Sequence, residues 1–152
     1  MIKCVDSTIT FAEIPTEISL AYAITNCENK CHGCHSPWLR KDLGSELTKE
    51  SLSVMIDTHK GITCVLFLGE GNDQQALFTL ADYARSKGFK TAVYSGRTDV
   101  ERDLFQEHFD YVKIGPYDPE YGPLKNPDTN QRLYKIADGE WEDITYLFWK
   151  KE

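Results

Sequence analysis

The chain has 152 residues, enough for one domain with a hydrophobic core and too few for two ordinary ones. Hydrophobic residues make up 41% of it and charged residues 27%, as in ordinary globular proteins. The formal net charge of −7 disfavours nucleic acid as a partner, because binding a phosphate backbone needs clustered Lys and Arg. Residues 62–68 form the longest apolar run, which is too short to cross a bilayer, and the first residues lack the apolar core of a signal peptide. We therefore expect one cytoplasmic domain over residues 1–152, with no membrane partner.

The first half of the chain predicts strands around one helix. Residues 18–25 are typical of a strand that runs into a cysteine-rich loop, and residues 8–13 predict a partner strand. Thr48 is a good cap for a helix that ends at Gly61. Residues 62–68 are apolar without alternation, which predicts a strand that is covered on both faces.

The second half repeats this pattern. An apolar stripe predicts a helix that begins near Asn72 and ends at Gly88, and its members are Leu77, Leu80, Ala81 and Ala84. Residues 90–95, 111–114 and 133–136 predict strands, residues 98–108 a short helix, and the proline-rich residues 115–130 a loop. The aromatic residues 141–149 fit an edge strand or a short helix equally well. Strands that alternate with helices predict βα units and a parallel sheet.

Three cysteines with the spacing C-x3-C-x2-C follow the strand at 18–25: Cys27, Cys31 and Cys34. Three thiolates hold three corners of a cubane iron–sulfur cluster and leave one iron open to another ligand. A structural zinc site is the alternative, but it requires a fourth ligand, which His32, His35 or a distant cysteine would have to supply. A disulfide framework fits less well, because three thiols do not pair off. Cys4 and Cys64 lie in apolar segments and are expected to be small core residues.

The cysteine spacing resembles the signature of the radical S-adenosylmethionine (SAM) enzymes. The residues from Cys31 to Pro37, with residues 111–117 and 129–136, are similar to segments of the activating proteins of anaerobic ribonucleotide reductase. This resemblance covers nearly the whole chain. Because a full (β/α) barrel needs about 250 residues, the fold that it implies is α/β: a partial, open β/α barrel with a curved, mostly parallel sheet and helices outside.

The resemblance also implies an activity. Such an enzyme uses a 4Fe-4S cluster to cleave SAM reductively and to generate a glycyl radical on the anaerobic ribonucleotide reductase, with electrons from a small donor such as flavodoxin or ferredoxin. Activation of another glycyl-radical enzyme, such as pyruvate formate-lyase, is an alternative, although those activases are generally longer. A zinc-binding adaptor without catalysis is a second alternative.

Site residues follow from the same resemblance, which implies no catalytic side chain. Cys27, Cys31 and Cys34 are the expected cluster ligands. Gly33 and His35 flank the third cysteine and are expected to contact SAM. The family has a glycine-rich acidic turn after its second strand, which meets the SAM ammonium. The corresponding turn here contains Gly69 and Glu70, and Ser95 ends the next strand, so we expect these three residues to bind SAM as well. Lys113 and Arg132 lie beside strands, where either a ligand or the partner protein is a possible contact, but such residues are usually solvated, so we expect solvation and leave both out of the site.

Overall fold

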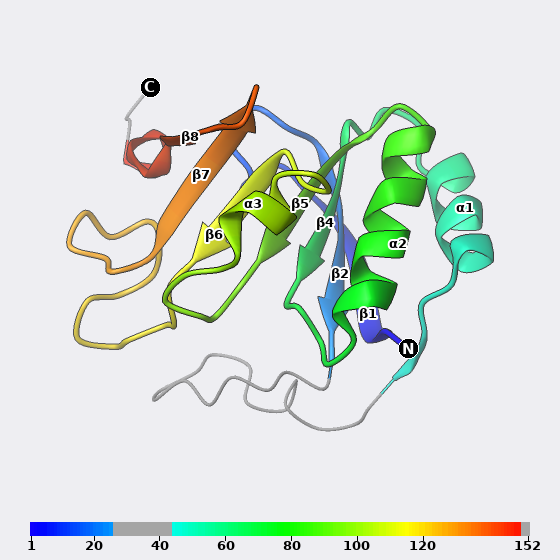
Figure 1. Cartoon of the computed structure of the whole chain (residues 1–152), viewed down its shortest axis with the longest axis horizontal. Helices are drawn as coiled ribbons and strands as arrows, with labels where there is room; N and C mark the ends of the chain where they lie inside the picture. The colour runs from blue at the N-terminus through cyan, green and yellow to red at the C-terminus, as the bar shows by residue number, and fades with distance from the viewer. Residues whose placement is uncertain (26–43, 150–152) are drawn as a thin grey trace.

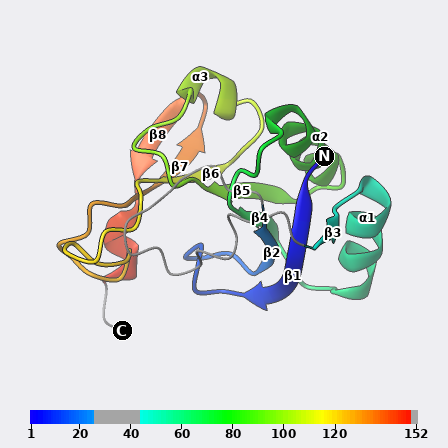
Figure 2. The same ribbon diagram turned by 90° about the horizontal axis from the view of Figure 1, so that it is seen from below.

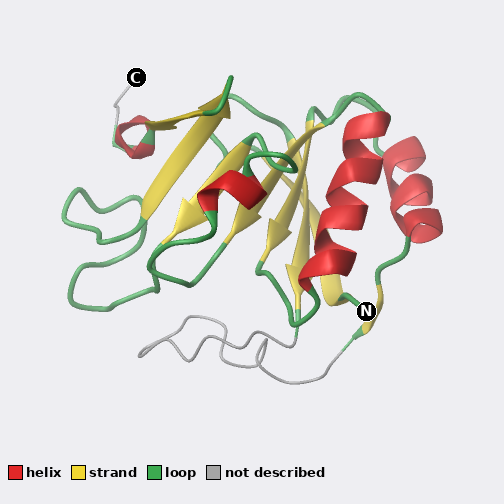
Figure 3. Ribbon diagram, in the orientation of Figure 1, coloured by secondary structure: helices red, strands yellow, loops and turns green. Residues whose placement is uncertain are grey.

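The computed structural model describes residues 1–25 and 44–149. This part of the chain forms one eight-stranded sheet with α-helices on one side (Figures 1 and 3). The strand order is β3-β1-β2-β4-β5-β6-β7-β8. The strands are β1 (Lys3–Thr10), β2 (Ser19–Ile24), β3 (Ser45–Glu46), β4 (Cys64–Leu68), β5 (Lys90–Tyr94), β6 (Tyr111–Ile114), β7 (Arg132–Ala137) and β8 (Glu140–Asp143). The helices are α1 (Lys49–Thr58), α2 (Gln74–Ser86), α3 (Arg102–Phe105) and a C-terminal 3₁₀-helix, η2 (Thr145–Phe148).

The centre of the sheet is parallel. β2 pairs with β4, β4 with β5, and β5 with β6, so these four strands end at the same edge of the sheet. Their last residues are Ile24, Leu68, Tyr94 and Ile114. Because α1 and α2 make the connections on either side of β4, the central βα units predicted from the sequence are present (Figure 1).

The flanks of the sheet are antiparallel, and the predicted fold is therefore wrong. β1 pairs with both β2 and β3 in the antiparallel sense, and β7 pairs in that sense with both β6 and β8. The described residues thus form a mixed, strand-rich sheet with three short α-helices, not a partial β/α barrel with a mostly parallel sheet. The reason lies in the connections: no α-helix crosses between β6 and β7, and a tight turn at Asp138 and Gly139, both with positive φ, joins β7 to β8.

The two faces of the sheet are covered differently (Figure 2). The three α-helices pack on one face, where the core contains Leu52 of α1, Leu77 of α2 and Phe105 of α3. The opposite face is covered by irregular segments and η2, which contribute Ile14, Leu124 and Ile144, with Leu147 and Phe148 at its margin. The full set of apolar residues predicted for α2 is buried, which confirms that stripe.

The helix boundaries test the predicted caps. Thr48 caps α1 as predicted, and its partner is Ser51: Ser51 N–H donates to Thr48 Oγ1 at 3.1 Å, and Thr48 N–H donates to Ser51 Oγ at 2.9 Å. The helix expected to begin near Asn72 is capped by Asp73, whose carboxylate accepts the N–H of Ala76. Residues 141–149, unassigned from the sequence, contain most of β8 and all of η2. None of the helices within the described ranges has the length and apolar character needed to span a membrane.

Candidate functional site

The expected site residues divide into two groups. Cys27, Cys31 and Cys34, the expected cluster ligands, lie outside the described residues, as do Gly33 and His35. Gly69, Glu70 and Ser95 are described, and they follow two neighbouring parallel strands. Thr25, the last described residue before the cysteines, follows β2 at the same edge of the sheet. Ligands of α/β proteins commonly bind at this carboxyl edge.

The turn after β4 places the Glu70 side chain. Gly69 and Gly71 have φ values of +126° and +68°, in the region that only glycine adopts readily. A Cβ atom on Gly71 would also lie 3.0 Å from Ile2 Cδ1 and 3.2 Å from Ile24 Cγ2. The turn is therefore packed directly on the core, and it holds Glu70 close to the loop after β5.

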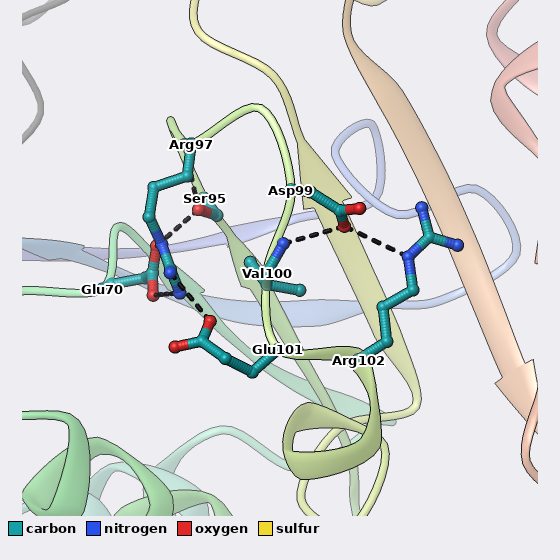
Figure 4. Close-up of polar contacts among 7 residues, drawn as sticks. All are labelled: Glu70, Ser95, Arg97, Asp99, Val100, Glu101 and Arg102. Carbon is teal, nitrogen blue, oxygen red and sulfur yellow. Dashed lines mark hydrogen bonds and ion pairs between the residues drawn. The ribbon is translucent and has the colours of Figure 1, made fainter.

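Glu70 is held by Ser95 and Arg97, and we call these three residues the Glu70 cluster (Figure 4). Arg97 grips both carboxylate oxygens, with Nε 3.0 Å from Oε2 and Nη2 2.7 Å from Oε1. The Ser95 hydroxyl also donates to Oε2, and Ser95 Oγ in turn accepts the backbone N–H of Arg97 at 3.1 Å. Such two-point contacts between guanidinium and carboxylate fix orientation as well as charge.

The cluster reaches outward through a second acid. Nη1 of Arg97 lies 2.8 Å from Oε2 of Glu101, the residue before α3. The hydrogen bond to Glu70 is the main cause of the raised pKa of Arg97, and the Glu101 contact adds to it. The hydrogen bond from Arg97 lowers the pKa of Glu101. The side chain of Glu70 is 14% exposed and that of Arg97 34%, so the cluster is partly accessible to solvent.

Lys113 lies on the other face of the sheet, and its predicted solvation is wrong. It is only 7% exposed, and its ammonium donates to the carbonyl oxygens of Ser95 at 3.2 Å and Gly115 at 2.9 Å. The Tyr94 ring centroid lies 5.6 Å from Nζ. A cavity of about 370 Å³ opens beside this ammonium, and its lining includes Glu13, Tyr94, Tyr117, Gln131 and Phe148. Arg132 is half-exposed and lies 3.6 Å from Asp143 Oδ2.

Sequence reasoning found two members of the cluster and missed the third. Ser95 was expected to bind SAM directly, yet its hydroxyl donates a hydrogen bond to Glu70. Arg97 was not singled out, although it lies two residues beyond Ser95, in the loop that leaves the carboxyl end of β5. The useful signal was position: a cation in one loop and an acid in the neighbouring loop meet when both loops follow adjacent parallel strands.

The cluster offers one carboxylate and one guanidinium rather than a set of metal ligands. Within residues 1–25 and 44–149, no group of three or more His, Cys, Asp or Glu side chains is arranged to hold a metal ion.

The chain matched no protein-family model, no curated protein and no solved structure in the three comparisons made.

Proposed function

We propose that the protein is a radical SAM activase, which uses a 4Fe-4S cluster to cleave S-adenosylmethionine and generates a glycyl radical on an anaerobic ribonucleotide reductase. The spacing of Cys27, Cys31 and Cys34 carries the proposal, because three closely spaced thiolates suit a cluster with one open iron. The arrangement of the strands adds support: β2, which leads into the cysteine segment, ends at the same edge as the strands that position the Glu70 cluster. The proposal does not depend on a barrel.

The donor set of the Glu70 cluster fits the amino-acid part of SAM. That part carries an ammonium and a carboxylate, and the cluster presents a carboxylate and a guanidinium on side chains that are 14% and 34% exposed. Glu70 suits the ammonium, and the guanidinium of Arg97 suits the carboxylate. Both residues are held by loops on a rigid sheet, so neither has to be ordered when the ligand binds.

In this proposal the chain's own residues bind SAM and orient it. Arg97 keeps the Glu70 carboxylate fixed by two hydrogen bonds, and Ser95, in the same loop as Arg97, donates a hydrogen bond to one of the carboxylate oxygens. One-electron cleavage of the sulfonium bond is the chemistry that the bound cofactors supply, and a glycine of the partner reductase is the hydrogen donor. Flavodoxin or ferredoxin is the expected electron donor. The protein's contribution is position and shelter from water.

Anaerobic reconstitution with iron and sulfide tests the proposal. We expect a brown protein with about four irons per chain, whose visible absorption is bleached by dithionite and which produces 5′-deoxyadenosine from SAM. Cys27→Ala, Cys31→Ala and Cys34→Ala should each abolish this production. Cys64→Ala is the matched control and should retain it, because Cys64 is buried in β4, away from the carboxyl edge.

The partner is tested by adding anaerobic ribonucleotide reductase with SAM and reductant in the absence of oxygen. The expected result is the electron paramagnetic resonance doublet of a glycyl radical. A doublet with pyruvate formate-lyase but none with the reductase would transfer the proposal to the other class of activase. A colourless protein that binds one zinc and cleaves no SAM would overturn it.

A further inference from the structure

The cavity of about 370 Å³ beside Lys113 lies at the carboxyl edge of the parallel strands, and no residue of the Glu70 cluster lines it. Tyr94, the last residue of β5, lines it from the sheet, while Leu124 and Phe148 line it from the loop after β6 and from η2. All three side chains pack in or against the core on the face opposite the α-helices. Ser95, which holds Glu70, follows Tyr94 directly, so the cavity adjoins the proposed SAM site.

The lining of this cavity includes a buried side-chain amide, that of Gln131. Gln131 is 6% exposed, and its Nε2 lies 3.4 Å from the carbonyl oxygen of Gly115. No other residue in the described part of the chain donates a hydrogen bond to its Oε1. Buried amide oxygens in proteins normally accept a hydrogen bond, and the backbone N–H of a peptide is a suitable donor. Gln131 therefore indicates a ligand that brings an N–H group into the cavity.

The charges around the cavity favour an anionic group. Lys113 and Lys125 line it against one acid, Glu13, although the whole chain has a formal net charge of −7. The Lys113 ammonium donates to two backbone carbonyl oxygens and is buried. Lys125 is exposed, and it forms no ion pair with any residue that the structure describes. Because partners meet with complementary charge, the ligand that fits combines an apolar group with a carboxylate.

We infer that the cavity receives an acidic segment of the partner reductase. A backbone N–H of that segment donates to Gln131 Oε1, an apolar side chain packs against Leu124 and Phe148, and a carboxylate pairs with Lys125. The inference rests on the proposed function, in which a glycine of the partner has to reach the carboxyl edge of the sheet. Because the α-helices cover one face, the segment approaches that edge from the face on which the cavity lies.

Charge reversal at Lys125 tests the inference. Lys125 is exposed, so Lys125→Glu leaves the core unchanged but places an acid opposite the carboxylate of the partner. The dissociation constant of full-length anaerobic ribonucleotide reductase, measured by biolayer interferometry without SAM, should rise about tenfold, because like charges in contact oppose binding. The difference should shrink at high salt. Gln131→Leu removes the acceptor with little change in volume and should weaken binding about fivefold.

Lys60→Glu is the matched control, because it makes the same change of charge at an exposed lysine between α1 and the amino end of β4. It should bind the reductase as the parent protein does. Far-ultraviolet circular dichroism confirms that each variant is folded, and SAM cleavage without the reductase should match the parent in all of them.

Three outcomes would overturn the inference. They are a parent protein that does not bind the reductase, equal reductase affinity in the parent and Lys125→Glu proteins, and a folded Lys125→Glu protein that no longer cleaves SAM without the reductase, which would assign the cavity to SAM. A parent protein that binds the reductase through Lys125 but cleaves no SAM would support the inference and refute the proposed function alone.

Discussion

Two carboxylates lie at opposite ends of the parallel strands and are held in different ways. Glu70, at the carboxyl end, is paired with the guanidinium of Arg97. Glu17, near the amino end, is 8% exposed and accepts hydrogen bonds of 2.7 Å from the Tyr111 and Thr63 hydroxyls. No cation within 4.0 Å of Glu17 is found among the described residues. One acid is thus held by charge and the other by neutral donors.

The difference separates a binding role from a structural one. The two partners of Glu70 come from the glycine-containing loop after β5, and the side chain of Arg97 is 34% exposed. The partners of Glu17 belong to the sheet: Tyr111 begins β6, and Thr63 precedes β4. Glu17 therefore ties the connection between β1 and β2 to the sheet core. We expect substitutions in the Glu70 cluster to affect ligand binding and substitutions at Glu17 to affect stability.

The largest effect is expected for Arg97→Leu, and it depends on the proposed function. The variant removes the two hydrogen bonds from Arg97 to Glu70 and the cation offered to the ligand carboxylate. Charge-assisted hydrogen bonds contribute about 1.5–3 kcal/mol each, so SAM affinity should fall by about 100-fold. Arg97→Lys keeps the charge but not the two-point contact, so its SAM affinity should lie between those of the parent protein and of Arg97→Leu. Equilibrium dialysis of SAM with the reconstituted protein measures the change; equal affinity in parent and Arg97→Leu proteins would contradict this role.

Glu17→Ala should lower stability and leave ligand binding alone. It leaves the Tyr111 and Thr63 hydroxyls without their acceptor in a buried setting, which costs about 1–3 kcal/mol. The free energy of unfolding is measured by urea titration. Glu13→Ala is the matched control on the same connection, because Glu13 accepts the Tyr94 hydroxyl through its backbone carbonyl. A loss of SAM affinity in folded Glu17→Ala protein would break the distinction between the two acids.

The two carboxylates also show which features of the structure could be predicted from the sequence. The apolar run at 62–68 and the stripe of α2 predicted buried elements correctly, because a continuous apolar run and a helical apolar stripe are both visible in the local sequence. The direction of β7 was not predicted, because it depends on how the chain returns after β6. Neither the Glu70 cluster nor the Glu17 contacts could be derived in full: Tyr111 and Glu17 are 94 residues apart. Position at a strand end indicated Glu70 and Ser95, and the same criterion would have indicated Arg97.

The smallest effect is expected for Glu101→Gln, which removes the outer partner of Arg97 and leaves Glu70 in place. Glu101 is more than half exposed, and exposed ion pairs contribute about 0.2–1 kcal/mol, so stability and SAM affinity should change little. The hydrogen bond from Arg97 lowers the folded-state pKa of Glu101 below its ordinary 4.5. Its stabilising contribution is therefore present above pH 4.5 and is lost as the pH falls through the folded-state value. Urea titrations of parent and variant should accordingly differ slightly at pH 7 and converge in acid. A large loss of SAM affinity in Glu101→Gln would instead make the outer acid, rather than Glu70, the partner that keeps Arg97 in position.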